Sequence, residues 1–193
     1  DSLGIEAVHK QPIPFPYDSV PHSCLSDDYA FDYGVIKLTT YYKKLLLQNN
    51  VQALDEESWE KQPGKVDFYV LLGIPAELVK TEYPNVSITP TLHKVESVDD
   101  KPEGFSNVDI PLFYGHILLA DGIESMKGLS GGPIFAFHKN EKGEVRYWLT
   151  ALQSRCLSES HYIAACPTKL LGDFLESLSS RHPGGETPPG ACL

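Results

Sequence analysis

The chain has 193 residues, of which 41% are hydrophobic and 22% are charged, with a formal net charge of −10. This length allows one domain or two small packed barrels, and this composition excludes an intrinsically disordered chain. A nucleic-acid partner is not expected, because binding to phosphates requires a basic surface and the 16 lysines and arginines are scattered. A membrane partner is not expected either, because no apolar run approaches the roughly 18 residues of a membrane span.

The N-terminal third of the chain changes from loop-like to helical composition. Residues 1–31 are rich in proline, aspartate and serine, which predicts extended chain and loop. A strand is expected at residues 32–38, and residues 40–48 and 52–61 have a helical composition. The pair Pro63-Gly64 ends this helical stretch.

From Val66 onward, short apolar segments are separated by turn residues, a pattern typical of β-structure. Six strands within about a hundred residues fit a small antiparallel barrel. They are expected at residues 66–74, 85–98, 112–120, 134–138, 145–154 and 161–165. A helix is expected at residues 168–179, where Thr168 follows Pro167 and is placed to cap the helix.

The run Gly128-Leu129-Ser130-Gly131-Gly132-Pro133 lies between two apolar stretches and is the most informative motif of the sequence. When a serine attacks a carbonyl group, the carbonyl oxygen becomes an oxyanion that needs N–H donors. The backbone of Gly128 and Ser130 would supply these donors, and glycine at 128 lets the peptide turn inward without a Cβ clash. The pattern therefore predicts Ser130 as a nucleophile, and an ordinary glycine-rich hairpin is the alternative.

A serine hydroxyl becomes an effective nucleophile only when a base takes its proton, and that base is normally a histidine oriented by a carboxylate. Asp32 is the candidate carboxylate. It comes just before the short apolar strand at residues 35–38 and lies 98 residues before Ser130. An aspartate that merely begins a strand is the alternative for this residue.

These motifs resemble the trypsin-like (chymotrypsin-fold) serine peptidases. The resemblance covers residues 30–180 and is specific around Ser130. It implies an all-β fold, a trypsin-like double β-barrel with a C-terminal α-helix, and an active site between the two barrels. Leu129 stands where secreted members have an aspartate that pairs with the new N-terminus after activation. The chain is therefore more similar to the intracellular or bacterial branch, which needs no zymogen cleavage.

The resemblance also implies a domain organisation. Residues 1–40 would form a partial N-terminal barrel, and residues 41–64 a helical interdomain linker. Residues 65–182 would form the C-terminal six-stranded barrel together with its closing helix. The remaining residues, 183–193, lack core-forming side chains and are expected to form a flexible tail.

The catalytic histidine is the main departure from the family pattern. The family places it some tens of residues before the aspartate, but only 31 residues precede Asp32, too few for an entire barrel. His9 is the internal candidate, and a loop histidine before a proline-rich stretch is its alternative. We expect the histidine to lie upstream of Asp1 in a longer protein. A pseudoenzyme that kept the oxyanion turn and lost the base is the remaining alternative. Structural or surface roles are expected for His93, His116, His138, His161 and His182.

The resemblance further implies which residues contact the substrate. The strand after the nucleophile lines the cleft in the family and pairs with the substrate backbone, a role that falls on Ser154, Arg155 and Cys156. The residue six positions before the nucleophile, here Glu124, lies at the base of the primary pocket. A carboxylate there would favour arginine or lysine in the substrate, and a solvated loop glutamate is the alternative.

The four cysteines show neither a CxxC pair nor the spacing of a zinc site. We therefore expect reduced thiols in a cytoplasmic protein, because disulfide frameworks belong to oxidising compartments. A bridge between Cys156 and Cys166 is the alternative.

The sequence as a whole predicts a serine endopeptidase that acts on a protein or peptide substrate and needs no cofactor or metal. A catalytically inactive, peptidase-like module that binds extended peptides by strand addition is the rival interpretation. An esterase is disfavoured, because a strand rather than a helix is expected after the serine.

Overall fold

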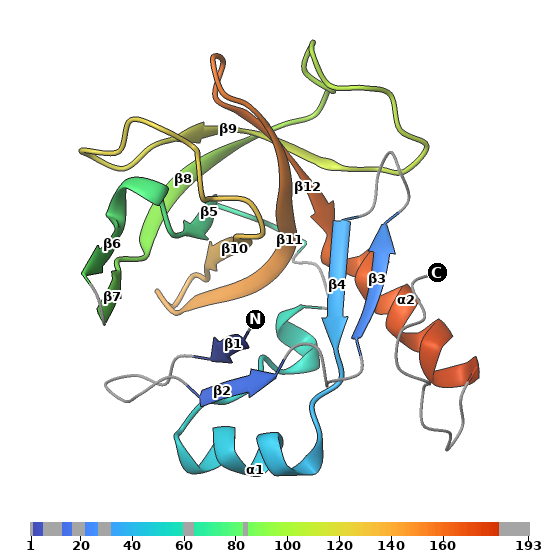
Figure 1. Ribbon diagram of the computed structural model, residues 1–193. Coiled ribbons are helices and arrows are strands. Elements are labelled where there is room, and N and C mark those ends of the chain that lie inside the picture. The colour runs from blue at the N-terminus through green and yellow to red at the C-terminus, as the bar shows by residue number, and fades with distance from the viewer. Residues whose placement is uncertain are drawn as a thin grey trace. The chain divides into compact units, whose positions relative to one another are not determined.

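Six antiparallel strands close into a barrel that holds the main hydrophobic core of the protein (Figure 1). The computed structural model describes residues 2–5, 13–16, 22–26, 32–59, 64–82 and 85–181. The chain divides into two compact units. The barrel unit comprises residues 56–174, and the other unit comprises residues 1–55 and 175–193.

The order of strands around the barrel is β10–β11–β12–β9–β8–β5, and β5 pairs with β10 to close it. All neighbouring pairs are antiparallel. Each strand overlaps one of the six segments predicted from the sequence, so the predicted six-stranded antiparallel barrel is confirmed. The strands are β5 (Phe68–Gly73), β8 (Thr91–Val98), β9 (Phe113–Leu118), β10 (Pro133–Lys139), β11 (Val145–Leu157) and β12 (Tyr162–Pro167).

The barrel core forms because alternate residues of a strand point to the same side of the sheet. In β10, Ile134 and Ala136 are fully buried, whereas the residues between and after them are only partly buried. β8 repeats this pattern with His93 and Val95. The core consists of Leu71, Val95, Ile117, Met126, Leu129, Ile134, Ala151, Ile163 and Ala165.

The segment predicted as one strand at residues 85–98 is in fact two strands. β7 (Asn85–Ile88) pairs with β6 (Val79–Glu82) in a separate hairpin, and β8 begins only at Thr91. Pro90 lies between β7 and β8 and has no N–H group for a sheet hydrogen bond. The proline therefore separates the barrel strand from the hairpin strand.

The first unit contains two further hairpins where residues 1–31 were expected to be extended chain and loop. β1 (Ser2–Ile5) pairs with β2 (Ile13–Pro16), and β3 (His22–Ser26) pairs with β4 (Asp32–Ile36). β2 contains two prolines, which a two-stranded sheet tolerates because each of its strands is an edge. β4 confirms the strand predicted at residues 32–38, although it ends at Ile36.

The predicted helix at residues 40–48 is α1 (Thr40–Gln48). It ends because Asn50 adopts a left-handed φ of 59°. The N–H groups of Asn50 and Val51 then donate to the carbonyl oxygens of Leu47 and Leu46, which completes a Schellman motif. The helical stretch expected at 52–61 is wrong for the described residues, where it is reduced to a single 3₁₀ turn (Glu56–Ser58).

The predicted C-terminal helix is confirmed as α2 (Thr168–Arg181). Thr168, expected as its cap, is instead the first helical residue, and its buried hydroxyl group lies 2.8 Å from the carbonyl oxygen of Leu149 in β11. Gly172 lets the ring of Trp59 approach the helix closely. None of the described helices has the length and apolar character needed to cross a membrane. The expected tail at residues 183–193 lies outside the described residues.

Candidate active site

The turn that contains Ser130 lies in the loop between β9 and β10. Gly128 and Gly131 both have left-handed backbone angles, with φ of 91° and 83°. Leu129 is only 2% exposed and belongs to the barrel core, whereas Ser130 is exposed. The turn therefore inserts one apolar side chain into the core and presents the next side chain, a serine, to the solvent.

Backbone hydrogen bonds attach the turn to β11 directly after Ser130. The N–H group of Gly131 donates to the carbonyl oxygen of Gln153 at 2.8 Å. The N–H group of Gln153 in turn donates to the carbonyl oxygen of Gly132 at 2.9 Å. The position of Ser130 is thus fixed by a rigid strand and does not depend on the loop alone.

The N–H groups of this turn differ in whether they have an acceptor. The N–H of Leu129 donates to the carbonyl oxygen of Met126 at 3.2 Å. By contrast, within the part of the chain that the structure describes, no hydrogen bond uses the N–H of Gly128 or of Ser130. Both residues are exposed. These two amides, which the sequence predicts as the oxyanion hole, are therefore available to an external acceptor.

Two glycines let the turn pack directly against the end of β5. A Cβ atom on Gly128 would lie 2.6 Å from the carbonyl oxygen of Ile74 and 2.8 Å from the backbone nitrogen of Ala76. A Cβ atom on Gly73 would lie 2.5 Å from Cδ2 of Leu129. All three distances are much shorter than van der Waals contact. Position 128 requires glycine because its neighbours are backbone atoms, whereas a side chain at position 73 would require only the end of the Leu129 side chain to move. The role of Gly73 was not identified from the sequence.

Glu77 anchors the loop that contains Glu124. It lies in a 3₁₀ turn (Ala76–Leu78), and its Oε1 atom accepts hydrogen bonds from the N–H groups of Glu124 at 3.1 Å and Ser125 at 2.9 Å. The Glu124 side chain itself is exposed. The sequence gives no signal for this contact, because Glu77 is one of 26 acidic residues and lies 47 positions before Glu124.

We expect Glu77→Ala to release the loop around Glu124. Two adjacent N–H groups lose their shared acceptor, which should accelerate their exchange with solvent deuterons by about tenfold, the equivalent of one hydrogen bond. Hydrogen exchange of peptides that cover residues 121–127 measures this change. Glu77→Gln keeps an acceptor oxygen in place and should show much less acceleration. Equal exchange rates in Glu77→Ala and the unaltered protein would contradict the anchoring role.

One edge of β11 has no strand neighbour over its last residues, as far as the described residues show. β10 pairs with β11 only up to Leu152, whereas β12 pairs with β11 up to Leu157. The segment at residues 153–157 begins at Gln153, which is bonded to the Ser130 turn. An extended chain could therefore add to this edge directly beside Ser130.

The predicted substrate-contacting residues Ser154 and Arg155 lie on this segment of β11. The register changes here, because Gln153 pairs with Ala165 whereas Arg155 pairs with Ala164. Ser154 is the extra residue of this irregularity, and its hydroxyl group donates to the carbonyl oxygen of Ala164 at 3.3 Å. Such a bulge bends the strand and re-orients its edge.

Gln153 is a further polar residue of the site that the sequence did not single out. Its side chain is only 4% exposed, and its Nε2 atom donates to the carbonyl oxygen of Arg155 at 3.1 Å. Among the described residues, nothing donates to its buried Oε1 atom. Buried acceptors are rarely left unpaired, so this oxygen is an exception among the described polar groups.

Asp32 and His9 are not brought together with Ser130 by the described structure. Asp32 is the first residue of β4 and belongs to the unit of residues 1–55, whereas Ser130 belongs to the barrel unit. His9 lies outside the described residues. The pairing of these residues with Ser130 stays a prediction.

The histidines whose side chains are described make contacts away from Ser130. Nδ1 of His138 lies 3.0 Å from Oδ2 of Asp67. The rings of His116 and His161 are stacked, with 6.3 Å between their centroids. His93 is fully buried in the barrel, and His182 lies outside the described residues.

His93 holds the start of the loop that carries the Ser130 turn. Its Nδ1 atom accepts a hydrogen bond from the N–H of Ala120 at 3.0 Å, so its proton must be on Nε2, which lies 2.7 Å from Oγ1 of Thr91. Burial lowers the pKa of His93 below its ordinary value of 6.5. A second proton on Nδ1 would break the bond to Ala120, so the fold requires the neutral ring.

We expect His93 to make stability fall as the pH decreases below about 6.5. Below this pH, His93 binds a proton in the unfolded state but not in the folded state, where its pKa is lower. Its contribution to the free energy of unfolding is therefore complete above this pH and decreases as the pH falls toward the folded-state pKa. The free energy of unfolding should change by at most about 1.4 kcal/mol per pH unit through this group. Denaturant unfolding between pH 7.5 and 5 measures it. His93→Asn keeps an acceptor for Ala120 and should lose this slope, whereas the control His161→Asn should keep it.

Cys156 and Cys166 are free thiols, so the alternative of a bridge between them is not observed. On the paired strands, Cys156 lies opposite Ile163 and Cys166 lies opposite Leu152, well apart along the ladder. Among the described residues, no group of three or more histidine, cysteine, aspartate or glutamate side chains could hold a metal ion.

Comparison of the chain with protein-family models, with curated proteins and with solved structures gave no significant match. The geometry of the Ser130 turn and the residues around it are therefore the basis for assigning a function.

Proposed function

We propose that this chain carries the nucleophile, oxyanion hole and substrate-binding strand of a serine endopeptidase with a trypsin-like double barrel. The described six-stranded barrel corresponds to the C-terminal barrel in this proposal. The observation that carries it is the turn at Ser130, where an exposed serine lies next to two N–H groups without an acceptor in the described part of the chain. This combination is what stabilisation of an oxyanion on an attacked carbonyl requires.

In the proposed mechanism, the Ser130 hydroxyl oxygen attacks the scissile carbonyl carbon while a histidine takes the hydroxyl proton. The carbonyl oxygen becomes negatively charged and accepts hydrogen bonds from the N–H groups of Gly128 and Ser130. The histidine then gives the proton to the leaving amine, which leaves an acyl-serine that water hydrolyses. Asp32 keeps the histidine in the required orientation, and the histidine comes from upstream of Asp32.

The substrate would bind as an extended peptide along the β11 edge at residues 153–157. The register change at Ser154 and the lack of a described neighbour on this edge support that position. Glu124 contributes a carboxylate to the adjoining loop, which favours a basic substrate residue.

A peptide-binding module without catalysis is the second candidate. None of the histidines with described side chains bonds to Ser130, and the β11 edge by itself suffices for strand addition. In this case the Ser130 turn would act only as a structural support for the binding strand.

Labelling of the purified protein with a fluorophosphonate probe tests the proposal. The probe reacts with serines whose hydroxyl is activated by a base, so a peptidase should become labelled on the peptide that contains Ser130. A folded sample that binds extended peptides but takes up no label would favour the binding module and contradict the peptidase.

A further inference from the structure

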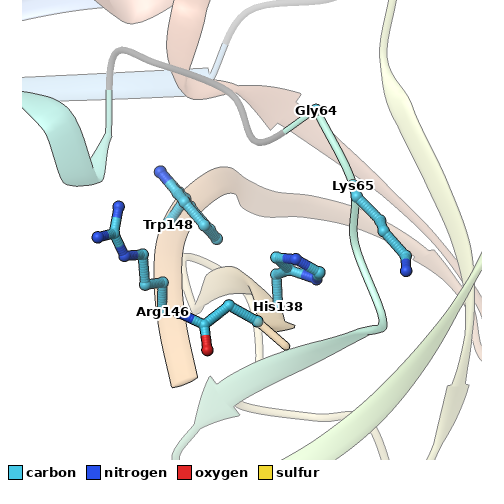
Figure 2. A pocket seen from close by; sticks show the side chains of 6 residues that line it. Gly64, Lys65, His138, Arg146 and Trp148 are labelled. Atoms are coloured by element: carbon cyan, nitrogen blue, oxygen red, sulfur yellow. The ribbon is translucent and has the colours of Figure 1, made fainter. Parts of the chain in front are cut away.

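A hollow of about 530 Å³ lies at the far end of β10 from the Ser130 turn (Figure 2). The turn precedes Pro133, the first residue of β10, whereas the hollow is lined by His138 near the end of this strand. Five residues of strand correspond to roughly 17 Å, so the hollow is separate from the proposed active site. Its volume is within the range of small-molecule sites, about 300–1,000 Å³. The lining residues are Gly64, Lys65, His138, Asn140, Arg146 and Trp148.

Among the described residues, the two lining side chains with a permanent charge, Lys65 and Arg146, are basic, although the chain has a net charge of −10. The surface that faces the hollow is otherwise almost entirely apolar, so these charges lie at its rim. Lys65 and Arg146 are exposed. In the described part of the chain, no ion pair joins either of them to a carboxylate. The charge of Lys65 acts on the nearby Asp67 carboxylate and helps to lower its pKa. The charge of Arg146 has no such described partner and is available to a ligand.

The carboxylates of Asp67 and Glu144 each accept hydrogen bonds from neighbouring residues of the hollow. Oδ2 of Asp67 accepts the N–H of Lys139 at 2.7 Å and also lies 3.0 Å from Nδ1 of His138. These contacts, that to Lys139 above all, lower the pKa of Asp67 below its usual 3.8. The carboxylate of Glu144 accepts a hydrogen bond from Nδ2 of Asn140 at 2.7 Å. Neither carboxylate neutralises Lys65 or Arg146 by direct contact.

Trp148 adds a flat apolar surface to this basic hollow. Arg146 and Trp148 are two positions apart on β11 and therefore share one face of the sheet. On β10, His138 lies opposite Arg146, and the buried Ala136 lies opposite Trp148. Figure 2 shows Arg146 and Trp148 on one side of the hollow, Lys65 on the other and His138 between them.

We propose that this hollow binds a small anion that carries an aromatic ring, with the ring against Trp148 and the acidic group at Arg146 or Lys65. A guanidinium group pairs with a phosphate or carboxylate through two parallel hydrogen bonds, and aromatic rings stack on the face of tryptophan. The anion is a phosphate, as in a nucleotide, or a carboxylate, as in an aryl acid. This site is independent of the proposed peptidase activity.

Isothermal titration calorimetry with adenosine 5′-monophosphate and, separately, with benzoate tests the proposal and distinguishes the two anions. At least one of them should bind the folded protein, and adenosine or inorganic phosphate alone should bind at least about tenfold more weakly than the nucleotide. Arg146→Met and Lys65→Met should each weaken binding, and the double variant by about tenfold or more. Lys80→Met removes the same charge from β6, outside the hollow, and should change the affinity less than twofold.

Trp148 provides a separate readout. Binding should change the tryptophan fluorescence of the protein, and Trp59→Phe should keep this change because Trp59 does not line the hollow. Trp148→Leu should reduce the advantage of the nucleotide over inorganic phosphate. The proposal is overturned if neither probe binds the folded protein below about 5 mM. It is also overturned if the Arg146 and Lys65 variants bind like the unaltered protein, or if inorganic phosphate binds as tightly as the nucleotide.

Discussion

Ser130→Ala is expected to abolish both fluorophosphonate labelling and peptide hydrolysis by the full-length gene product while leaving the fold intact. Loss of a serine nucleophile lowers turnover by roughly 10⁶-fold in enzymes of this mechanism. The Ser130 side chain is exposed, and within the described structure no hydrogen bond involves its hydroxyl group. Thermal unfolding should therefore differ by no more than about 0.5 kcal/mol from that of the unaltered protein.

Ser125→Ala is the matched control for this experiment. Ser125 is an exposed serine of the same loop, and its hydroxyl oxygen accepts a hydrogen bond from the N–H of Lys127 at 3.1 Å. It plays no part in the proposed chemistry, so Ser125→Ala should keep labelling and hydrolysis. Labelling of Ser130→Ala at the level of the unaltered protein would exclude Ser130 as the nucleophile.

Gly128→Ala is expected to destabilise the protein by about 3 kcal/mol and to lower its melting temperature by roughly 6–12 °C. The left-handed φ of 91° is strained for alanine. In addition, the new Cβ atom would lie 2.6 Å from the carbonyl oxygen of Ile74 and 2.8 Å from the nitrogen of Ala76. Both neighbours are backbone atoms and cannot rotate away, so the turn or the end of β5 must move.

Gly122→Ala distinguishes backbone strain from steric clash as causes of the lost stability in Gly128→Ala. Gly122 also has a left-handed φ, of 81°, but a Cβ atom there would meet no atom within 4 Å. This variant should therefore show the backbone strain alone, about 1–2 kcal/mol. Differential scanning calorimetry of the two variants measures the difference, and equal melting temperatures would contradict tight packing of Gly128 against β5. Gly128→Ala should also lose fluorophosphonate labelling, because the clash displaces an amide of the proposed oxyanion hole.

Local patterns in the sequence were sufficient to predict the barrel and the Ser130 turn. Alternating apolar residues identify strands such as β10, and the glycines at 128 and 131 mark a tight turn, in which the structure gives both of them a left-handed φ. These features depend on neighbouring residues alone, so they can be read without knowing the rest of the fold.

The contacts that support the turn could not be predicted, because they join distant segments. Glu77 reaches the loop of Glu124 only because β5 ends beside that loop. Likewise, nothing local distinguishes Gly73 from other glycines until Leu129 is found against it. The helical composition of residues 52–61 was misleading for a related reason, since weak propensity in a short segment yields to its surroundings.

The burial of Leu129 has a consequence for protein design. The hexapeptide from Gly128 to Pro133 looks like a module that could be grafted onto another barrel to install an oxyanion hole. Its geometry, however, depends on a leucine that fills the core and on the close approach of Gly128 to the backbone of Ile74 and Ala76, more than fifty residues earlier. A recipient barrel whose backbone follows another path beside Gly128 would not hold the turn in this conformation, and the amides next to the transplanted serine would be displaced. The smallest transferable unit is therefore the turn together with the end of β5.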